Sequence, residues 1–561
     1  MKNSGLRQRK SRPPSGAPEV LSPLLFWIVV AGAVAIVLAA YSPSLQFHFI
    51  LDDNRFVQDP RIQFPGHVWE YFTNWVWAQF AGGPASFYRP LFLLWMRANF
   101  VLSGMAPWGW HFLSVLKHMA VAVLLGVLAW RLLRDRTAAW IAGALFAIHP
   151  AHTESVAWVT VPDPLMAAGV LASILLYLRY RDFPYPHQRS PGDQPKRSRS
   201  KSENVRPSIG WLVAASILYL AALLAKETAI VTLGVLLVVA LMSDRLIDIF
   251  RKMSLFVAAT LVYLLLRQHA LGIWLSASTR HLPWRTVLLS LPATLWFYLK
   301  VLVWPIRSYA FGDPTETHGF SLRTVLLPGL AVGCAVALLG FGLFWAFRTA
   351  RRDLTAQEAA GVHCSLVLGA LLLILPLLPA LNLNALNPED YLHGRYAYLS
   401  TAGLMLLLAT GWHLASSLRR PLLIGAASVA IAFLALTVSQ ETAWNDDLSV
   451  FAEGQRNAPH NVFVGRNLTR AHVQQALGWG RCQDAVPVFE DAVRRYPDDW
   501  VGWAGLGDCL DQLNDLPRAE QALHRAADLA HLPQVTARWR EVSEKCSAGC
   551  QPPADWQSAP R

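Results

Sequence analysis

The stretch Phe47-His48-Phe49-Ile50-Leu51-Asp52-Asp53-Asn54 directly follows the first long apolar segment of the chain, about Leu24 to Tyr41. It places two adjacent carboxylates where the chain is expected to leave a membrane. Further clusters of charged and imidazole side chains also stand at the ends of apolar segments: His149 to Glu154, Lys226-Glu227, Arg267, and Glu389-Asp390 with Arg395. If all of these clusters reach the same membrane face, they form one polar site above the bilayer.

The composition is that of a membrane protein. The chain has 561 residues, of which 54% are hydrophobic and only 15% charged, whereas soluble domains carry about 25% charged residues. Several apolar runs approach the roughly 20 residues that cross a bilayer. Much of the net charge of +12 lies in short loops beside these runs, which is the pattern that sets membrane orientation. We therefore predict the lipid bilayer as a partner and no nucleic acid.

The order of the apolar runs predicts an all-α fold, with a polytopic membrane domain over residues 23–438. Basic turns at 131–136, 244–252, 348–352 and 419–420 assign the cytoplasmic face. All of these basic turns lie on the cytoplasmic face if the chain crosses the membrane 11 times and the run 287–304 is embedded without crossing. The amino terminus is then cytoplasmic, and the polar clusters and the carboxyl terminus are external.

The segments outside the apolar runs have distinct compositions. Residues 1–22 are expected to be a basic cytoplasmic tail, and residues 181–208 a disordered cytoplasmic loop poor in apolar residues. Residues 43–108 are expected to be a long external loop. Its aromatic residues suggest an amphipathic helix on the membrane surface: Trp69, Tyr71, Phe72, Trp75 and Trp77.

After residue 438 the composition changes to that of a soluble helical domain. Ala485, Phe489 and Ala492 recur 34 residues later as Ala519, Leu523 and Ala526. This period, with small residues at these offsets, is the signature of tetratricopeptide repeats. We predict a short α-solenoid over residues 439–545, capped by residues 534–545 and followed by a tail, 546–561.

The cysteines leave two interpretations open. Four of the six lie in the repeat region: Cys482, Cys509, Cys546 and Cys550. If this region is in an oxidising compartment, they can form two disulfides in three pairings. Alternatively, they are buried free thiols that pack between helices.

The acidic and imidazole clusters also have two interpretations each. Asp52 and Asp53 could supply a general base or oxygen ligands for a divalent metal such as Mg or Mn, or they could merely solvate a membrane exit. His149, His152 and Glu154 could bind a metal, or could hydrogen-bond a phosphate or sugar. Their alternative role is to cap a helix break.

The basic candidates are suited to an anionic ligand. Arg267 and Arg395 carry permanent charge that suits a lipid phosphate, although arginines at the ends of spans commonly reach toward the interface for other reasons. Lys226 could instead form a self-neutralising pair with its neighbour Glu227.

The ordered set of these motifs resembles one known family. It comprises FxLDD, YRP (Tyr88-Arg89-Pro90), HPxHTExV (His149–Val156), Asp163, Lys226-Glu227 and RYxYL (Arg395–Leu399). This order, followed by the repeats, resembles the transmembrane and tetratricopeptide-repeat-containing protein O-mannosyltransferases, which belong to the GT-C glycosyltransferases. The chain departs from them in having Val161-Pro162 where the family typically has an Arg shortly before the Asp.

The resemblance implies an enzyme that transfers a mannose-like sugar from a polyprenyl-phosphate donor to a hydroxyl of an acceptor protein or glycan, on the external face, by an inverting single displacement. Asp53, ranked before Asp52, would be the general base. Arg395, with Lys226 or Arg267, would hold the donor phosphate. The other candidates for substrate binding are His149, His152, Glu154, Asp163, Arg89 and Tyr396. The repeats would bind a protein partner.

Other functions remain open at this point. The chain could be a non-catalytic membrane scaffold that acts through its repeats, a polymerase or ligase of lipid-linked glycans, or a transporter. A transporter is the least favoured, because ionisable residues near the bilayer midplane and broken helices in matched halves are not evident. We expect a bacterial inner-membrane protein with periplasmic repeats; in a eukaryote the repeats would be lumenal.

Overall fold

The computed structural model describes Gly32 and residues 34–79, 87–183, 208–242, 245–274, 281–387, 390–415, 418–478 and 482–546. All regular secondary structure within these ranges is helical, which confirms the all-α fold class. Several predicted segments lie outside the described residues: the tail 1–22, half of the first apolar run, nearly all of the loop 181–208, Glu389 and the tail after Cys546.

Eight described helices are long and apolar enough to cross a membrane, which agrees with a multi-pass membrane domain. They are α6 (Pro107–Leu133), α9 (Asp163–Tyr180), α12 (Leu246–Leu271), α13 (Trp284–Val303), α14 (Leu327–Asp353) with a preceding π-helical turn, α15 (Ala356–Ile374), α16 (Tyr398–Leu414) and α17 (Arg419–Glu441). Shorter apolar helices accompany them: Val34–Gln46, α5 (Pro90–Ser103), α10 (Ile209–Ala225) and α11 (Val231–Leu241). Helix α7 (Arg136–Ala147) follows α6.

The predicted count of eleven crossings is not confirmed by these helices and stays a prediction. The run 287–304, which we expected to be embedded without crossing, forms α13, and this helix is long and apolar enough to cross.

The basic turns lie together at one end of the helical bundle. The carboxylate of Asp135 contacts both His413, at 3.2 Å, and Arg419, at 3.1 Å. Helix α9 begins at Asp163 and ends at Tyr180, whose ring lies 5.8 Å from Lys252 Nζ. An 18-residue helix is about 27 Å long, close to the thickness of the hydrocarbon core. The end of α9 at Asp163 therefore lies one membrane thickness away from the basic turns.

Close contact between α15 and α16 shows how the bundle is packed. A Cβ atom at Gly403 would lie 2.3 Å from the Leu373 backbone nitrogen and 2.6 Å from the Gly369 carbonyl oxygen. Only glycine permits this approach, which is typical of helices packed in a membrane. By contrast, α14 and α17 are only 6% buried over their most apolar windows, so their apolar side chains are available to lipid.

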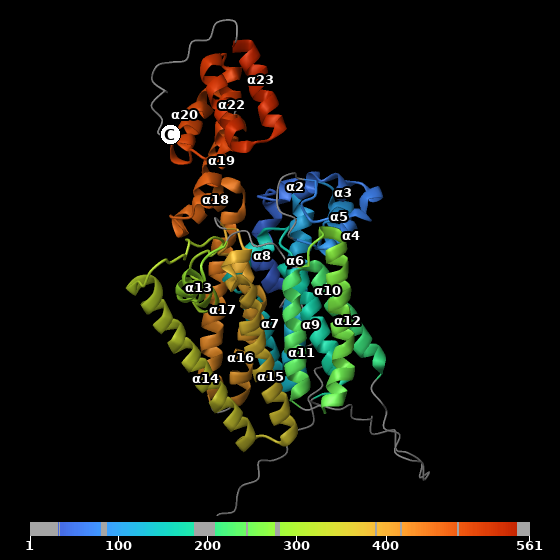
Figure 1. Ribbon diagram of the computed structural model, residues 1–561. Helices are drawn as coiled ribbons and strands as arrows, with labels where there is room; N and C mark the ends of the chain where they lie inside the picture. The colour runs from blue at the N-terminus through green and yellow to red at the C-terminus, as the bar shows by residue number, and fades with distance from the viewer. Residues whose placement is uncertain are drawn as a thin grey trace, which may run out of the picture.

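The segment 43–108, which was expected to be an external loop, contains several short helices that form a cap on the bundle (Figure 1). Its helices are α2 (Asp53–Gln58), α3 (Pro60–Gln63), α4 (Glu70–Thr73) and α5, with 3-10 turns at Ser42–Gln46 and Pro65–His67. The predicted amphipathic surface helix is wrong, because only the single turn α4 is helical there. Tyr71 in this turn is fully buried, and its hydroxyl donates to the carbonyl oxygen of Arg61.

The repeat domain lies at the same end of the bundle as this cap (Figure 1). Helix α18 (Asp447–Asn457) leads into it, and it contains α19 (Val462–Gly478), α20 (Cys482–Arg495), α21 (Trp500–Gln512), α22 (Leu516–Ala530) and α23 (Pro533–Cys546). Ala485, Phe489 and Leu523 are buried between these helices. Helix α23 covers the last pair, where the sequence predicted a cap.

The two interpretations of the cysteines apply to different residues. Cys482 and Cys509 are buried free thiols, whereas Cys546 is disulfide-bonded.

Candidate functional site

A cavity of about 390 Å³ lies where the cap meets the bundle. Its polar lining consists mainly of residues singled out from the sequence: Asp52, Arg89, Asp163, Lys226, Glu227, Arg395 and Tyr396. Aromatic side chains form much of the remaining wall: Phe56, Trp77, Phe87, Phe92 and Trp158. Segments more than 300 residues apart in the chain therefore meet at one cavity.

Asp52 and Asp53 lie in different surroundings, although they are neighbours. Asp53 is fully buried and does not line the cavity. Its Oδ1 accepts hydrogen bonds from the backbone N–H and the hydroxyl of Thr160, at 3.1 and 2.7 Å, and its Oδ2 accepts one from the Ile50 N–H at 3.3 Å. Burial raises the pKa of Asp53 to about 8 against these hydrogen bonds, so the carboxyl is mostly neutral at pH 7.

Asp52 faces the cavity instead. Among the described residues, no side chain or backbone group forms a hydrogen bond or ion pair with its carboxylate. Burial raises the pKa of Asp52 to about 6, while Arg55 and Arg395 oppose this rise. Asp52 is therefore ionised at neutral pH and has both oxygens free to accept a proton.

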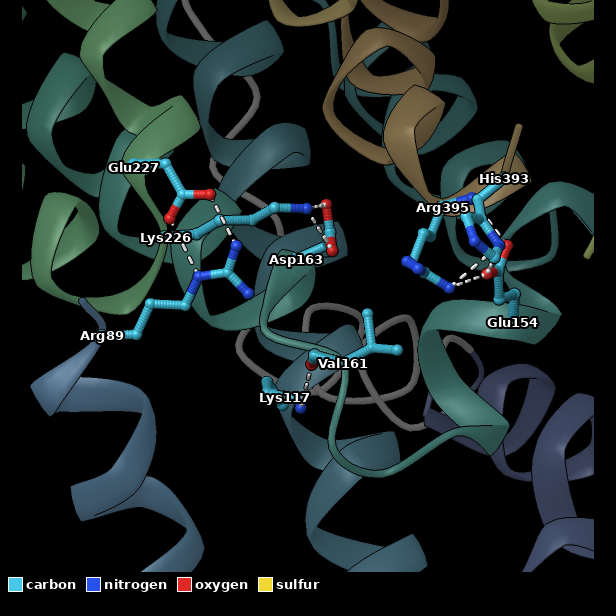
Figure 2. A network of polar contacts seen from close by, with 9 residues as sticks. All are labelled: Arg89, Lys117, Glu154, Val161, Asp163, Lys226, Glu227, His393 and Arg395. Atoms are coloured by element: carbon cyan, nitrogen blue, oxygen red, sulfur yellow. Dashed lines mark hydrogen bonds and ion pairs between the residues drawn. The ribbon is translucent and has the colours of Figure 1, made fainter. Parts of the chain in front are cut away.

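Lys226 and Asp163 form a buried ion pair in the cavity wall (Figure 2). Lys226 follows the last residue of α10 in an extended conformation, and Asp163 is the first residue of α9. Lys226 Nζ lies 2.7 and 2.8 Å from the two Asp163 carboxylate oxygens, and 5.2 Å from the centre of the Tyr396 ring. Burial lowers the pKa of Lys226, and the charge of Asp163 opposes this. Asp163 thus keeps a cation in a site that would otherwise disfavour one.

Arg89 forms a bidentate ion pair with Glu227. Its Nε and Nη2 lie 2.9 and 2.6 Å from the two carboxylate oxygens. Arg89 immediately precedes the helix α5, which begins at Pro90, so this contact ties the cap to the loop before α11. The side chains are 15% and 30% exposed, which leaves part of the guanidinium open to the cavity.

Arg395 is fixed by Glu154 from the short helix α8 (Thr153–Ala157). Glu154 accepts from Arg395 Nη1 at 2.5 Å and from its backbone N–H at 2.8 Å. The guanidinium also lies 4.7 Å from the centre of the Trp158 ring. Among the described contacts, Nη1 is the only side-chain nitrogen of Arg395 that a protein acceptor occupies, so its other N–H groups are available to a ligand.

His393 completes this group (Figure 2). Its Nδ1 donates to the carbonyl oxygen of Ala310 at 2.7 Å, and its Nε2 lies 3.1 Å from Asp390 Oδ2. Burial and Arg395 lower the pKa of His393, but Asp390 and Glu154 outweigh them and raise it to about 9. A protonated imidazole therefore adds a fourth positive charge near the cavity.

Besides Asp53, four candidates from the sequence do not line the cavity: Glu154, His149, His152 and Arg267. His149 is fully buried, with Nε2 3.2 Å from the Leu302 carbonyl oxygen and Nδ1 accepting from the Ala151 N–H. His152 is also fully buried and contacts the Thr401 hydroxyl at 2.6 Å. Arg267 lies on α12, where its Nε donates to the Trp274 carbonyl oxygen. The two histidines fix the helix break, which was the alternative role weighed for them.

Sequence reasoning missed two residues that shape the site. Thr160 holds Asp53, as described above. Lys117, on α6, is 5% exposed, and its Nζ donates to the Val161 carbonyl oxygen at 3.2 Å, which fixes the loop before Asp163 from below. A single lysine within an apolar run is the signal that could have identified Lys117.

The arrangement of the two aspartates does not fit a divalent metal, which the sequence had left as one possibility. Metal ions of this class need several oxygen ligands around one point, whereas Asp53 is directed to Thr160 and Asp52 to the cavity. In the part of the chain that the structure describes, no group of three or more His, Cys, Asp or Glu side chains is placed to hold a metal ion.

Comparisons with known proteins find similarity to mannosyltransferases and to tetratricopeptide repeats. A family model described as dolichyl-phosphate-mannose-protein mannosyltransferase matches residues 75–300, and a tetratricopeptide repeat model matches residues 476–537. Protein O-mannosyl-transferase Tmtc1 of Drosophila melanogaster is 31% identical over 207 residues, which cover 36% of this chain and 22% of that protein. Protein O-mannosyl-transferase TMTC3 of Mus musculus is 23% identical over 540 residues, which cover 90% of this chain and 54% of that protein.

The chain thus spans about half or less of the length of these relatives. Among solved structures, ArnT from Cupriavidus metallidurans bound to undecaprenyl phosphate aligns with a TM-score of 0.41 and 17% identity, covering 81% of this chain and 72% of that one.

Proposed function

We propose that this relative of the protein O-mannosyl-transferases transfers a sugar from a polyprenyl-phosphate-linked donor to a hydroxyl group of an acceptor. The observation that carries the proposal is that the unpaired carboxylate of Asp52 shares one cavity with three cationic side chains, Arg89, Lys226 and Arg395. A base and a phosphate-binding surface on the same cavity are what a displacement at the anomeric carbon of a sugar phosphate requires.

Asp52 is the general base in this proposal. It takes the proton of the acceptor hydroxyl while that oxygen forms a bond to the anomeric carbon. The bond between this carbon and the donor phosphate oxygen breaks, and its electron pair remains on the phosphate. A single displacement inverts the configuration at the carbon. The proposal reverses the ranking from the sequence, because Asp53 is mostly neutral and already occupied by Thr160.

The cations stabilise the phosphate as negative charge develops on it. Each is already oriented by a carboxylate: Arg395 by Glu154, Lys226 by Asp163 and Arg89 by Glu227. These carboxylates hold the three cationic side chains in place before the substrate binds, so little reorganisation accompanies the reaction. The aromatic wall formed by Trp158 and its neighbours suits the apolar faces of a sugar and the first units of the lipid.

The basic turns support one orientation in the membrane. They gather at the end of the bundle opposite the cavity, and positively charged loops favour the cytoplasm. We therefore place the cavity and the repeats on the external face, which is the periplasm of a bacterium or the lumen in a eukaryote. The repeats would bind the acceptor protein or a partner near the cavity.

Transfer by the purified full-length chain in proteoliposomes tests the proposal. The donors are polyprenyl-phosphate mannose and a panel of other polyprenyl-phosphate sugars, and the acceptors are hydroxyl-bearing peptides and glycans. Asp52→Asn should lower the rate by about 100- to 10,000-fold, the contribution expected of a general base. Asp53→Asn should lower the thermal stability but keep most of the turnover per folded molecule.

Two outcomes would overturn the proposal. Equal transfer by the wild type and Asp52→Asn would show that this carboxylate is not the base. No transfer from any donor, by a wild type that is folded and correctly inserted, would reject sugar transfer itself.

A further inference from the structure

The residue before the proposed base has an unusual backbone conformation. Leu51 has a φ of +50°, a left-handed conformation that is sterically unfavourable for residues with a Cβ atom. Two other residues of this kind, Arg134 and His531, end helices, which is the common place for it. Leu51 instead lies just before a helix, in a turn closed by the bond from the Asp53 N–H to the Ile50 carbonyl oxygen at 2.9 Å. A strained conformation of this kind persists where surrounding contacts stabilise it.

The first turn of α18 supplies this support. The backbone N–H of Leu51 donates to Oδ1 of Asp447 at 2.8 Å, across 396 positions of sequence. Nearby, the His48 N–H donates to the Asn445 carbonyl oxygen at 3.0 Å. The Leu51 side chain packs against a buried cluster that contains Trp444, Val450 and Phe451.

The conformation of Leu51 determines where the two aspartates point. With Leu51 left-handed, the chain turns directly into α2, and Asp53 reaches Thr160 while Asp52 faces the cavity. If Leu51 relaxes to an ordinary conformation, the directions of both following side chains change. The Leu51–Asp447 bond is therefore placed where it controls the orientation of Asp52.

We infer that Asp447 is a positioning residue for the proposed sugar transfer, and that it acts by holding Leu51 in the left-handed conformation that keeps Asp52 on the cavity. This inference rests on the proposed function, since it concerns the base of that reaction. It assigns a role to α18, the helix that joins the membrane domain to the repeats.

The same junction also supports the phosphate-binding side. Asn461 Nδ2 donates to the Gly312 carbonyl oxygen at 2.9 Å, and the His460 N–H donates to Asp313 Oδ1 at 2.8 Å. The segment that contains Gly312 in turn pairs with the segment of Arg395: the Gly312 N–H donates to the Leu392 carbonyl oxygen at 3.0 Å. The base of the repeat domain thus contacts the segment before Asp52 directly, and the segment before Arg395 through Gly312.

Neighbouring acids provide a matched test. Asp447→Ala removes the bond to Leu51. Asp446→Ala removes the cap of the same helix, where the Asp446 carboxylate accepts from the Ser449 N–H at 2.8 Å, but it leaves the bond to Leu51. Asp447→Asn keeps an oxygen that can accept from Leu51. Leu51→Gly removes the steric cost of the left-handed conformation.

We expect Asp447→Ala to lower kcat by about tenfold to a hundredfold, the loss associated with a hydrogen bond to a charged group, with KM for the donor within about twofold of wild type. Asp446→Ala and Asp447→Asn should stay within about threefold of wild type. Adding Leu51→Gly to Asp447→Ala should restore at least half of the lost activity on a logarithmic scale, which a purely structural defect would not show. The assay is transfer by the full chain in proteoliposomes.

Hydrogen exchange separates this inference from the proposed function. The Leu51 amide should be protected in the wild type and in Asp446→Ala, and should exchange at least tenfold faster in Asp447→Ala, whether or not sugar is transferred. An unchanged kcat in Asp447→Ala, an equal loss in Asp446→Ala, or unchanged exchange at Leu51 would overturn the inference. If any of these results is found while Asp52→Asn is inactive, the inference about Asp447 fails but the proposed function stands.

Discussion

The Lys226–Asp163 pair offers a prediction whose size follows from its burial. The two side chains are 6% and 4% exposed, and Lys226 Nζ contacts both carboxylate oxygens. Asp163→Asn leaves a buried ammonium without its counter-charge. Removing one partner of a buried pair costs about 3–5 kcal/mol, which changes the unfolding equilibrium by roughly two to three and a half orders of magnitude.

A second pair provides the comparison. Arg89 and Glu227 have similar contact geometry, but they are 15% and 30% exposed, so water screens the charge that remains when one partner is removed. Glu227→Gln should cost only about 1 kcal/mol. The double variant Asp163→Asn/Lys226→Met should recover most of the stability lost by Asp163→Asn, because no buried charge remains. It should not recover transfer, because a phosphate-binding cation is lost.

The pH dependence has a definite sign. Burial holds the pKa of Lys226 below its ordinary value, and loss of Asp163 lowers it further. The unfolded state of the variant then binds more protons than the folded state, so its stability rises with pH. The deficit of Asp163→Asn relative to wild type should therefore shrink from pH 6 to pH 9.

Unfolding of the purified chain by SDS in mixed micelles measures all of these variants under one condition. A cost for Asp163→Asn no larger than that for Glu227→Gln would refute the reasoning from burial. A deficit that grows with pH would refute the assignment of the remaining charge to Lys226.

Two further predictions concern the base and the bundle. Because burial raises the pKa of Asp52 to about 6 and the base must be ionised, transfer at saturating donor should fall about tenfold per unit well below pH 6; a flat rate from pH 4.5 to 8 contradicts this assignment. Gly403→Ala should lower the free energy of unfolding by about 1–3 kcal/mol through overpacking, whereas Gly411→Ala on the same helix, with nothing within 4 Å of the added Cβ, should not. Equal effects of the two alanines would show that α15 and α16 can separate.

Local chemistry made several site residues recognisable before the structure was known. Asp52, Arg89, Asp163, Lys226, Arg395 and Tyr396 all line the cavity. Charged residues at the ends of apolar runs are costly unless they have a partner or a function, so they stand out in a sequence this poor in charge. Glu154 was also recognisable, although it acts behind Arg395 and does not face the cavity itself.

The sequence was not sufficient where the arrangement depends on neighbours that are distant in sequence. Asp52 and Asp53 are chemically identical and adjacent, so the local sequence does not show which of them faces the cavity. The contact of Asp53 with Thr160 and the fold of the cap determine this. His149 and His152 have the chemistry of ligands, but burial and contacts with Leu302 and Thr401 occupy them. The aromatic run 69–77 is compatible with a surface helix, yet Tyr71 is needed in the core of the cap.

Composition and spacing along the chain were sufficient to predict the helical class, the membrane helices and the repeats. Apolar runs must be helical to satisfy their backbone in lipid, and a 34-residue period specifies paired helices. The direction of each aspartate and the partner of each cation became clear only from the folded arrangement. Those outcomes depend on burial and on bonds such as that between Leu51 and Asp447, which join parts of the chain that no local pattern relates.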